Sequence, residues 1–375
     1  MTKLLSRGIR ALAVTVLLGA PAGAQLAQHD NTGYGGTAAE FLLLGAGARG
    51  AALGGAFSAL ATDVTALYYN PGGLAQMSRP GAMVSTYSYI ADTRYTWAGI
   101  AFPLSGGSRA VGVSAGTFGF SDQPVYTLDN PDGDGSTYSV AETFISGTYS
   151  QNFSDRFAAG FTAKLISDKL GRTSASAFAV DFGTNFHAAI GERPIRAAFT
   201  IQNLGTNLEH SGSGLEAGAI RPPPLGTVNI PQEPQPARLR ASPWSLPVVF
   251  RVGVALELLS RGQNRVTLVS EFNQPNNSKP GAGAGLELTA MNVGNSGFWL
   301  SARGSYTLQP DNQLDPGTGA GFTTQQSTGN FTKDGLAVGG GIGFTRGDFR
   351  LGFDYAYRNL GPLGGTNFMS FSLGW

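Results

Sequence analysis

From about residue 80 onward, the sequence is a succession of short segments in which apolar and polar residues alternate. The segment from Phe349 to Arg358 is the clearest case: Phe, Leu, Phe, Tyr and Tyr occupy one face, and Arg, Gly, Asp, Ala and Arg the other. Because successive side chains of a β-strand point to opposite faces, this pattern predicts a strand with one apolar face. The same alternation recurs at 178–186, 195–202, 248–258 and 336–344.

Fourteen such segments can be counted, bounded by Gly, Pro, Asn and Asp. They are 80–91, 94–104, 108–120, 137–153, 156–168, 173–190, 194–205, 244–260, 263–274, 278–290, 297–308, 333–345, 348–358 and 366–375. The three long connections, 121–136, 206–243 and 309–332, all follow odd-numbered segments. Outer-membrane barrels have long loops on one side and short turns on the other. We therefore predict an all-β fold, a fourteen-stranded antiparallel transmembrane β-barrel over 80–375.

A soluble β-sandwich also alternates, but its polar face is rich in Lys and Glu. Here the polar faces carry Gly, Ala and Ser with isolated charges, and charged residues make up only 13% of the 375 residues, against ~25% in soluble domains. The absence of Cys excludes disulfides and Cys-ligated metals. A formal net charge of +1 argues against a nucleic-acid partner.

The N-terminus has the layout of a secretory signal peptide. Lys3, Arg7 and Arg10 precede an apolar run at 11–18, and a small Ala-Gly-Ala triplet ends at Ala24. We therefore expect a signal peptide at 1–24, with a retained N-terminal anchor as the alternative. Export to the outer membrane of a Gram-negative-type bacterium would follow.

The stretch 41–74 is rich in Ala, Leu and Gly and does not alternate. We predict that 25–79 is an N-terminal segment ending in a partly helical hatch, which fills the barrel lumen. Thr62 or Asp63 would cap a short helix that ends at Asn70. The expected hatch residues are Arg49, Gly54, Gly55, Asp63, Asn70, Pro71 and Gly72. Arg49 and Asp63 would pair with charges of the lumen; two solvated surface charges are the alternative.

The alternation also predicts which charged side chains face the lumen. They are Lys164, Asp181, Arg196, Arg251, Glu257, Glu271, Glu287, Arg303, Arg350, Asp354 and Arg358. Both signs occur in similar number, which favours a mutual ion-pair network that holds the hatch. Selectivity for a charged solute is a second hypothesis, although the balance of signs disfavours a strongly ion-selective pore.

With the hatch and the barrel defined, the chain resembles the PorV/PorQ family, within the FadL-like superfamily of outer-membrane proteins. The resemblance rests on five short motifs, from Phe41-Leu42 through Gly47-Ala48-Arg49-Gly50, Leu53-Gly54-Gly55-Ala56-Phe57 and Ala61-Thr62-Asp63 to Tyr69-Asn70-Pro71-Gly72-Gly73-Leu74-Ala75. The chain departs from the family pattern at Gly50, Leu53, Thr62, Tyr69 and Gly72. The resemblance implies a fourteen-stranded barrel with a lumenal hatch.

Two functions follow from that resemblance. FadL-like proteins pass hydrophobic small molecules, fatty-acid-like or aromatic, across the outer membrane, whereas PorV-type proteins dock exported cargo for type IX secretion. In FadL-like transport the ligand leaves through a kink in a strand, for which Gly339-Gly340-Gly341 is the best candidate. Expected partners are outer-membrane lipid, the barrel assembly machinery, and either a hydrophobic ligand or secretion-system proteins.

The other motifs of the sequence are weaker evidence for a functional site. Gly45 to Gly50 matches G-x-G-x-x-G but has no βαβ context, so glycines for tight turns are the better explanation. Asp129, Asp132 and Asp134 are a weak Ca²⁺ candidate, and an acidic turn is the alternative. The Pro-rich loop 206–243 is a stiff external segment that could cap the barrel mouth or meet a partner, or it is a disordered loop.

The last segment ends on alternating apolar residues, of which Phe371 and Trp375 resemble a barrel-assembly signal. The three scattered His residues offer no catalytic triad. We therefore expect no enzyme activity and no cofactor.

Overall fold

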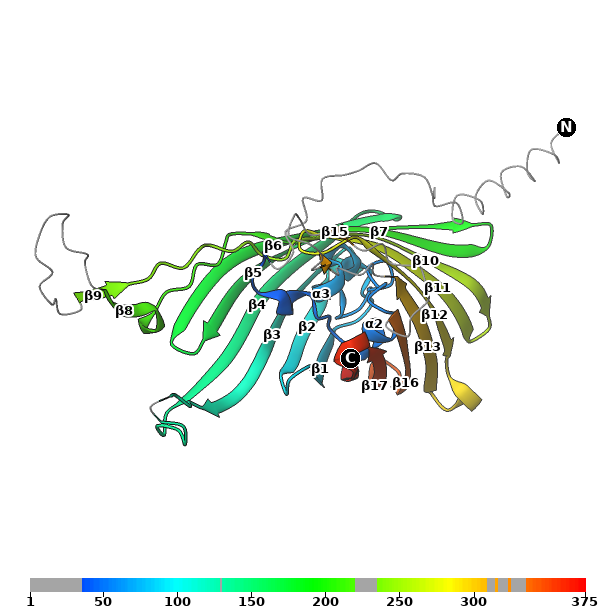
Figure 1. The fold of residues 1–375 in the computed structure, drawn as a ribbon. Coiled ribbons are helices and arrows are strands. Elements are labelled where there is room, and N and C mark those ends of the chain that lie inside the picture. Colours follow the sequence, from blue (N-terminus) through cyan, green and yellow to red (C-terminus); the bar gives the residue numbers. More distant parts are fainter. Residues whose placement is uncertain (1–35, 129, 220–234, 309–313, 316–322, 325–334) are drawn as a thin grey trace, which may run out of the picture. The chain divides into compact units, whose positions relative to one another are not determined.

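Fourteen antiparallel strands close into a barrel in the computed structural model (Figure 1). The structure describes residues 36–128, 130–219, 235–308, 314–315, 323–324 and 335–375. The expected signal peptide and residues 25–35 therefore lie outside the described residues. The barrel strands are β1 (Gly81–Ser88), β2 (Arg94–Leu104), β3 (Arg109–Pro124), β4 (Thr137–Ser154), β5 (Phe157–Leu170), β6 (Thr173–Ile190), β7 (Arg193–Gly205), β10 (Val249–Arg261), β11 (Asn264–Pro275), β12 (Gly281–Ala290), β13 (Phe298–Leu308), β16 (Leu336–Arg346), β17 (Phe349–Asn359) and β18 (Gly365–Gly374).

The strand count and the parity of the connections predicted from the sequence are confirmed. Each strand pairs with its sequence neighbour in the barrel, and β18 pairs with β1 to close it. The three long connections follow β3, β7 and β13, at the end that we call the loop end. The opposite end, the turn end, has connections as short as the two residues between β4 and β5.

One predicted strand boundary is wrong. The segment expected at 244–260 begins at Val249, five residues later. Pro243 precedes the missing part and Pro247 lies within it, and proline cannot donate a hydrogen bond to a strand neighbour. Trp244 instead forms an isolated bridge with Leu208.

The alternation of the strands separates an apolar outer face from a mixed inner face. Large side chains on the outside are strongly exposed, for example Ile145 at 59%, Leu165 at 61% and Phe371 at 56%. Their inward neighbours Ser146, Lys164 and Ser370 are buried. The β10–β11 register shifts between Glu257 and Leu259. The alternation predicted through Leu258 therefore stops at a β-bulge.

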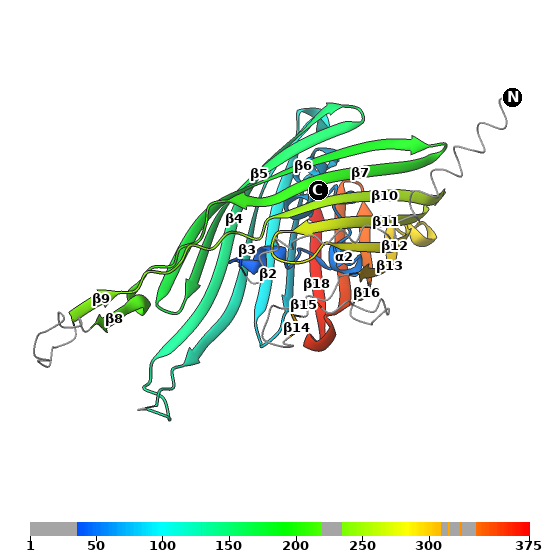
Figure 2. The ribbon, with the colours of Figure 1, turned by 45° about the horizontal axis from the view of Figure 1, so that its top comes forward.

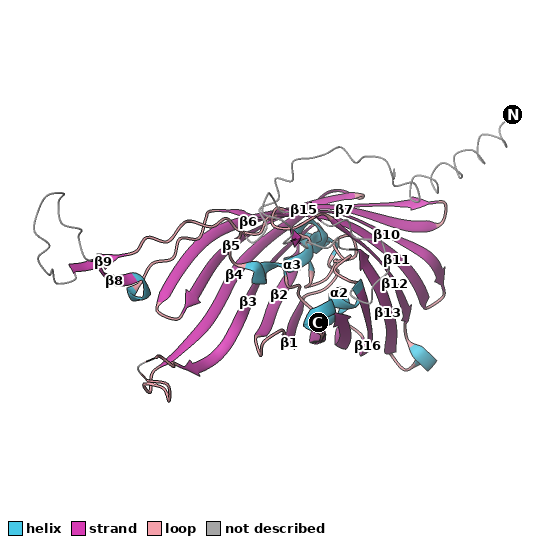
Figure 3. Ribbon diagram, viewed as in Figure 1, coloured by secondary structure: helices cyan, strands magenta, loops and turns pink. Residues whose placement is uncertain are grey.

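Residues 36–80 fold against the inner face of this barrel (Figures 1 and 2). The segment consists of short helical turns joined by loops, as the colouring of Figure 3 shows. These turns are η1 (Glu40–Leu43), α2 (Ala48–Ala52), α3 (Ala66–Tyr69) and η2 (Pro71–Gln76). Its apolar side chains are almost fully buried, including Phe41, Phe57 and Leu67. A barrel of about eight strands is filled by its own side chains, so one of fourteen needs this additional filling.

Smaller elements decorate the loops. The Pro-rich connection contains η4 (Ser213–Leu215) and a hairpin of β8 (Glu216–Ala219) and β9 (Gln235–Arg238), and β14 (Leu314–Asp315) pairs with β15 (Thr323–Thr324). Short turns η3 (Ser105–Gly107), η5 (Val293–Asn295) and η7 (Gly361–Leu363) complete the described connections. No helix within the described residues has the length and apolar character needed to cross a membrane.

Candidate functional site: the hatch and its lumenal contacts

An ion-pair network connects the hatch to the wall of the barrel. The Arg49 guanidinium of α2 donates from Nε and Nη2 to the two carboxylate oxygens of Glu287 on β12, both at 2.8 Å. Arg303 on β13 also donates to Glu287, at 2.6 Å, and to Asp354 on β17, at 2.5 Å. Arg49 reaches Asp63 within the hatch at 3.3 Å. One hatch cation therefore depends on wall residues for its neutralisation.

A second network holds the opposite side of the hatch. Glu271 on β11 accepts the backbone N–H of Ser58 at 2.8 Å and is paired with Arg251 on β10 at 3.3 Å. Arg251 also donates to Gln202, whose side chain donates to the carbonyl of Tyr68. The backbone of the hatch is thus bound by charged and amide side chains of three neighbouring strands.

A third buried pair lies in the wall. Lys164 on β5 and Asp181 on β6 are 2.7 Å apart, and both side chains are almost fully buried. Asn203, which adopts a positive φ of 62°, donates its backbone N–H to Asp181 and accepts from Lys164. The β6–β7 register shifts at this point. The bulge therefore supplies the polar partners that a buried ion pair needs.

The turn 63–73 shapes the middle of the hatch. Asp63 accepts the backbone N–H of Thr65 at 2.9 Å, just before α3. Asn70 accepts from the N–H of Gly72 and donates to the carbonyls of Ser58 and Thr184. The predicted helix thus spans only Ala66–Tyr69, and Asn70 begins η2 instead of only ending α3.

Glycine is needed where η2 meets the wall. A Cβ on Gly72 would lie 2.6 Å from the carbonyl oxygen of Gly183 and 2.7 Å from the Cα of Thr184. A Cβ on Gly160 of β5 would lie 2.5 Å from the carbonyl oxygen of Pro71. The backbone of η2 therefore rests directly on the backbone of β5 and β6. Gly54 and Gly55 adopt φ values of 65° and 81°, where the chain turns after α2.

Tyr68 fastens the start of the hatch to α3. Its hydroxyl donates to the carbonyl of Leu42 at 2.7 Å and accepts the N–H of Gly45 at 2.8 Å. Burial raises the pKa of Tyr68 to about 12, so the hydroxyl keeps the proton that it donates.

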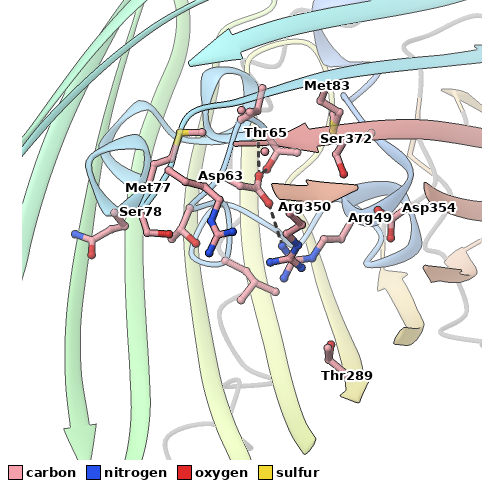
Figure 4. Close-up of a pocket in the computed structure, with 18 of the residues that line it drawn as sticks. Arg49, Asp63, Thr65, Met77, Ser78, Met83, Thr289, Arg350, Asp354 and Ser372 are labelled. Carbon is pink, nitrogen blue, oxygen red and sulfur yellow. Dashed lines mark hydrogen bonds and ion pairs between the residues drawn. The ribbon is translucent and has the colours of Figure 1, made fainter. Parts of the chain in front are cut away.

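Two cavities lie at opposite ends of the hatch. The larger, about 430 Å³, is at the turn end between the hatch and β7 to β18, and Figure 4 shows Arg49, Asp63, Arg350 and Asp354 around it. The smaller, about 160 Å³, is at the loop end and is lined by hatch residues such as Gly45 and Tyr69 and by Arg358 of the wall. The hatch residues between the cavities separate them.

The structure places all of the predicted lumen charges on the inner face. Arg196, Glu257 and Arg350 line the turn-end cavity. Arg265 and Trp299 line the same cavity and were not among the predicted residues, although the alternation of 263–274 and 297–308 places both on the inner face. The sequence did not predict the contacts of Gln202, Asn203 and Tyr68, because the alternation of a strand does not indicate which side chains meet across the lumen.

The expected exit at Gly339–Gly341 has no structural counterpart. Strand β16 pairs without a register shift with both β13 and β17 through these residues. A Cβ on Gly339 would lie 2.7 Å from the Cβ of Ala52. Gly339 therefore gives α2 room against the wall, and the three glycines open no gap in it.

The remaining candidates do not form sites within the described residues. Asp129 lies outside them, and Asp134 accepts the N–H and hydroxyl of Ser136. The described part of the chain contains no group of three His, Cys, Asp or Glu residues that could hold a metal. Gly50, in the G-x-G-x-x-G match, packs against the ring of Tyr69, which leaves no room for a side chain.

Comparison with known proteins identifies solved structures with a similar architecture. No protein-family model matches the sequence, and neither does any curated protein sequence. The toluene transporter TodX of Pseudomonas putida matches in structure with a TM-score of 0.51 over 88% of this chain and 97% of its own, at 11% identity. The monoaromatic hydrocarbon channel CymD gives the same values.

The toluene transporter TbuX of Ralstonia pickettii matches with a TM-score of 0.50 over 89% of this chain and 98% of its own, at 10% identity. The chain has the fold of these hydrocarbon channels. These neighbours are transporters and channels by name.

Proposed function

We propose that the chain is an outer-membrane channel for small hydrophobic molecules, closed by residues 36–80. The observation that carries the proposal is the fourteen-stranded barrel with a lumenal hatch, in the fold of two toluene transporters and a monoaromatic hydrocarbon channel. The apolar outer face suits insertion into a bilayer, because lipid offers backbone polar groups no partners and a closed barrel needs none.

The two cavities support a path along the hatch. A solute that enters at the loop end meets Tyr68 and Tyr69, and one that leaves at the turn end passes Arg49 and Asp63. The hatch between them is held by ion pairs and close backbone contacts. Passage therefore requires the hatch to rearrange while the barrel stays closed.

Uptake of toluene tests this proposal. The full chain is expressed in a host that lacks an uptake channel for aromatic hydrocarbons, and heat-modifiable migration on gels verifies that the barrel is folded in the outer membrane. Faster toluene uptake than in the empty-vector strain is expected. If the folded barrel is present and toluene uptake equals that of the empty-vector strain, the proposal is overturned.

A role in type IX secretion, as a docking protein for exported cargo, is the second candidate. Its support is the resemblance of 41–75 to the PorV/PorQ pattern, together with Tyr126, Leu128 and Tyr138, which are exposed at the loop end beyond the hatch. Pull-down of a cargo C-terminal domain by the purified barrel tests it. Loss of capture in a Tyr126→Ser, Tyr138→Ser variant is expected, and failure of the unaltered chain to capture the domain would count against the role.

We also propose that the C-terminal strand is read by the barrel assembly machinery. Phe371 faces outward, and the terminal Trp375 lies beside Phe102 with ring centroids 6.1 Å apart. Removal of Trp375 should lower the yield of assembled barrel in cells. Refolding of the same variant from urea into detergent should be unaffected, which separates recognition from stability.

A further inference from the structure

The turn-end cavity has an excess of positive charge. Four carboxylates line it, from Asp63, Glu257, Glu287 and Asp354. Six arginines line it as well: Arg49, Arg79, Arg196, Arg265, Arg303 and Arg350. Positive and negative side chains are similar in number over the whole predicted lumen, but positive ones outnumber negative ones in this cavity.

The excess lies outside the ion-pair network. Arg49 and Arg303 are neutralised by Asp63, Glu287 and Asp354. Within the described residues, the side chains of Arg196 and Arg265 make no hydrogen bond or ion pair. Glu257 makes none either, but its charge interacts with that of Arg196 at longer range. Guanidinium groups without a carboxylate partner, facing a cavity, favour an anionic occupant.

Arg350 has an aromatic partner in place of a carboxylate. Its guanidinium carbon lies 5.0 Å from the ring centroid of Trp299. Trp299 is 4% exposed, and its indole Nε1 has no hydrogen-bond partner within the described residues. The ring lies against Gly343 and Gly352, where any side chain would displace it. The wall therefore holds a buried aromatic ring with an unused N–H beside a guanidinium that makes no ion pair within the described residues.

The cavity lining also includes two methionines, Met77 of the hatch and Met83 of β1. Met77 and Met83 are nearly buried and line the same cavity (Figure 4). Thioether groups adapt their shape and make favourable contacts with aromatic rings. A volume of about 430 Å³ suits a small organic molecule.

We propose that the turn-end cavity is a binding site for a small aromatic carboxylate. The carboxylate is held by Arg350 beside Trp299, and the ring lies among Met77, Met83 and Trp299. Arg196 and Arg265 attract the anion without contacting it. This inference rests on the proposed channel function and adds aromatic compounds with one negative charge to its solutes.

Binding to the purified full chain in a neutral detergent tests the inference. Isothermal titration calorimetry is run with benzoate, with toluene and with inorganic phosphate. Benzoate is expected to bind more tightly than either of the others, because only it offers both a carboxylate and a ring.

Variants locate the site. Arg350→Gln should weaken benzoate binding roughly tenfold or more, as loss of a charge-assisted hydrogen bond does. Arg350→Lys should retain part of the benzoate affinity, since lysine keeps the positive charge but lacks the planar guanidinium group. Arg265→Gln should weaken binding by about two- to threefold at low salt and less at high salt. Trp299→Phe should weaken binding and remove the part of the tryptophan fluorescence that responds to benzoate.

Arg346→Gln is the matched control, because Arg346 is exposed at the same end of the barrel and does not line the cavity. It should bind benzoate like the unaltered chain. Equal weakening in Arg346→Gln and Arg350→Gln would overturn the inference, as would equal affinity for benzoate and phosphate. Heat-modifiable migration confirms that each variant is folded before titration.

Separate measurements test the binding site and the channel function, so either proposal can fail without the other. Benzoate affinity is measured at equilibrium without transport, and toluene uptake is measured in cells. Toluene uptake without benzoate binding overturns the inference and leaves the channel function standing. Benzoate binding that Arg350→Gln abolishes, with no uptake of toluene, supports the site and overturns the hydrocarbon function.

Discussion

At the scale of single residues, the hatch is held by buried charges. Glu287 is 5% exposed and accepts hydrogen bonds from both Arg49 and Arg303. Removing one member of a buried pair leaves an unpaired charge, which costs much more than loss of an exposed pair. Glu287 therefore joins the hatch to the wall more firmly than any surface ion pair could.

Glu287→Ala should lower the free energy of unfolding by about 3–5 kcal/mol, because two guanidinium groups then lose their carboxylate. Urea unfolding of the refolded barrel in detergent measures this. The control is Glu209→Ala, which removes an exposed pair with Arg240 and should cost about 1 kcal/mol or less. Similar losses in both variants would show that the network does not stabilise the fold.

The Lys164–Asp181 pair invites a double-mutant cycle. Lys164→Met should destabilise the barrel by about 3–5 kcal/mol, since Asp181 is then buried without a cation. Lys164→Met combined with Asp181→Asn should cost clearly less than the sum of the two single changes. The same urea titration gives all three values, and strict additivity would mean that the two groups do not interact.

At this scale, the sequence predicted on which face of the barrel wall a charged residue lies, but not the residue with which it pairs. Strand parity places Arg303, Asp354 and Glu271 inside, because a strand repeats every two residues. That Arg303 contacts Glu287 and Asp354, while Arg350 lies over Trp299, depends on the register between strands and on side-chain reach. Neither is encoded in one strand's pattern.

At the scale of elements, the strands were predictable, and the positions of the short helices inside the hatch were not. Thirteen of the fourteen strands begin within three residues of the predicted position, because turn residues end each alternating run. The exception is β10, where Pro247 delays pairing. In the hatch, helices of four or five residues have too few positions to show a period, so contacts with the wall determine them.

Gly72→Ala tests how η2 is seated. The new Cβ would meet the backbone of Gly183 and Thr184, which cannot move without breaking the sheet. We expect η2 to shift, with faster hydrogen exchange at 71–76 and a loss of about 1–3 kcal/mol in the unfolding free energy. Hydrogen exchange read by mass spectrometry checks the first expectation.

The control for this variant is Gly147→Ala on the outer face of β4, where an added Cβ would have no neighbour within 4 Å. Gly147→Ala should leave exchange at 71–76 unchanged. If Gly72→Ala also leaves it unchanged, the close backbone contact between η2 and β6 does not position the hatch.

At the scale of the whole molecule, the barrel and its hatch contribute separately to the closed state. Each barrel strand has two hydrogen-bonded neighbours, and β1 pairs with both β2 and β18. The ladder of the wall therefore does not depend on residues 36–79. The lumen does depend on them, since the hatch supplies the buried apolar core that fills it.

Deletion of 36–79 should therefore leave a barrel that closes and conducts. We expect heat-modifiable migration to persist at a lower unfolding temperature, because Glu287 loses Arg49 and Glu271 loses the N–H of Ser58. Ionic conductance in planar bilayers should rise well above that of the full chain. Deletion of 216–238, which removes the β8–β9 hairpin outside the barrel sheet, is the control and should leave conductance low. A hatch-deleted barrel that folds but does not conduct would mean that the wall itself closes the lumen.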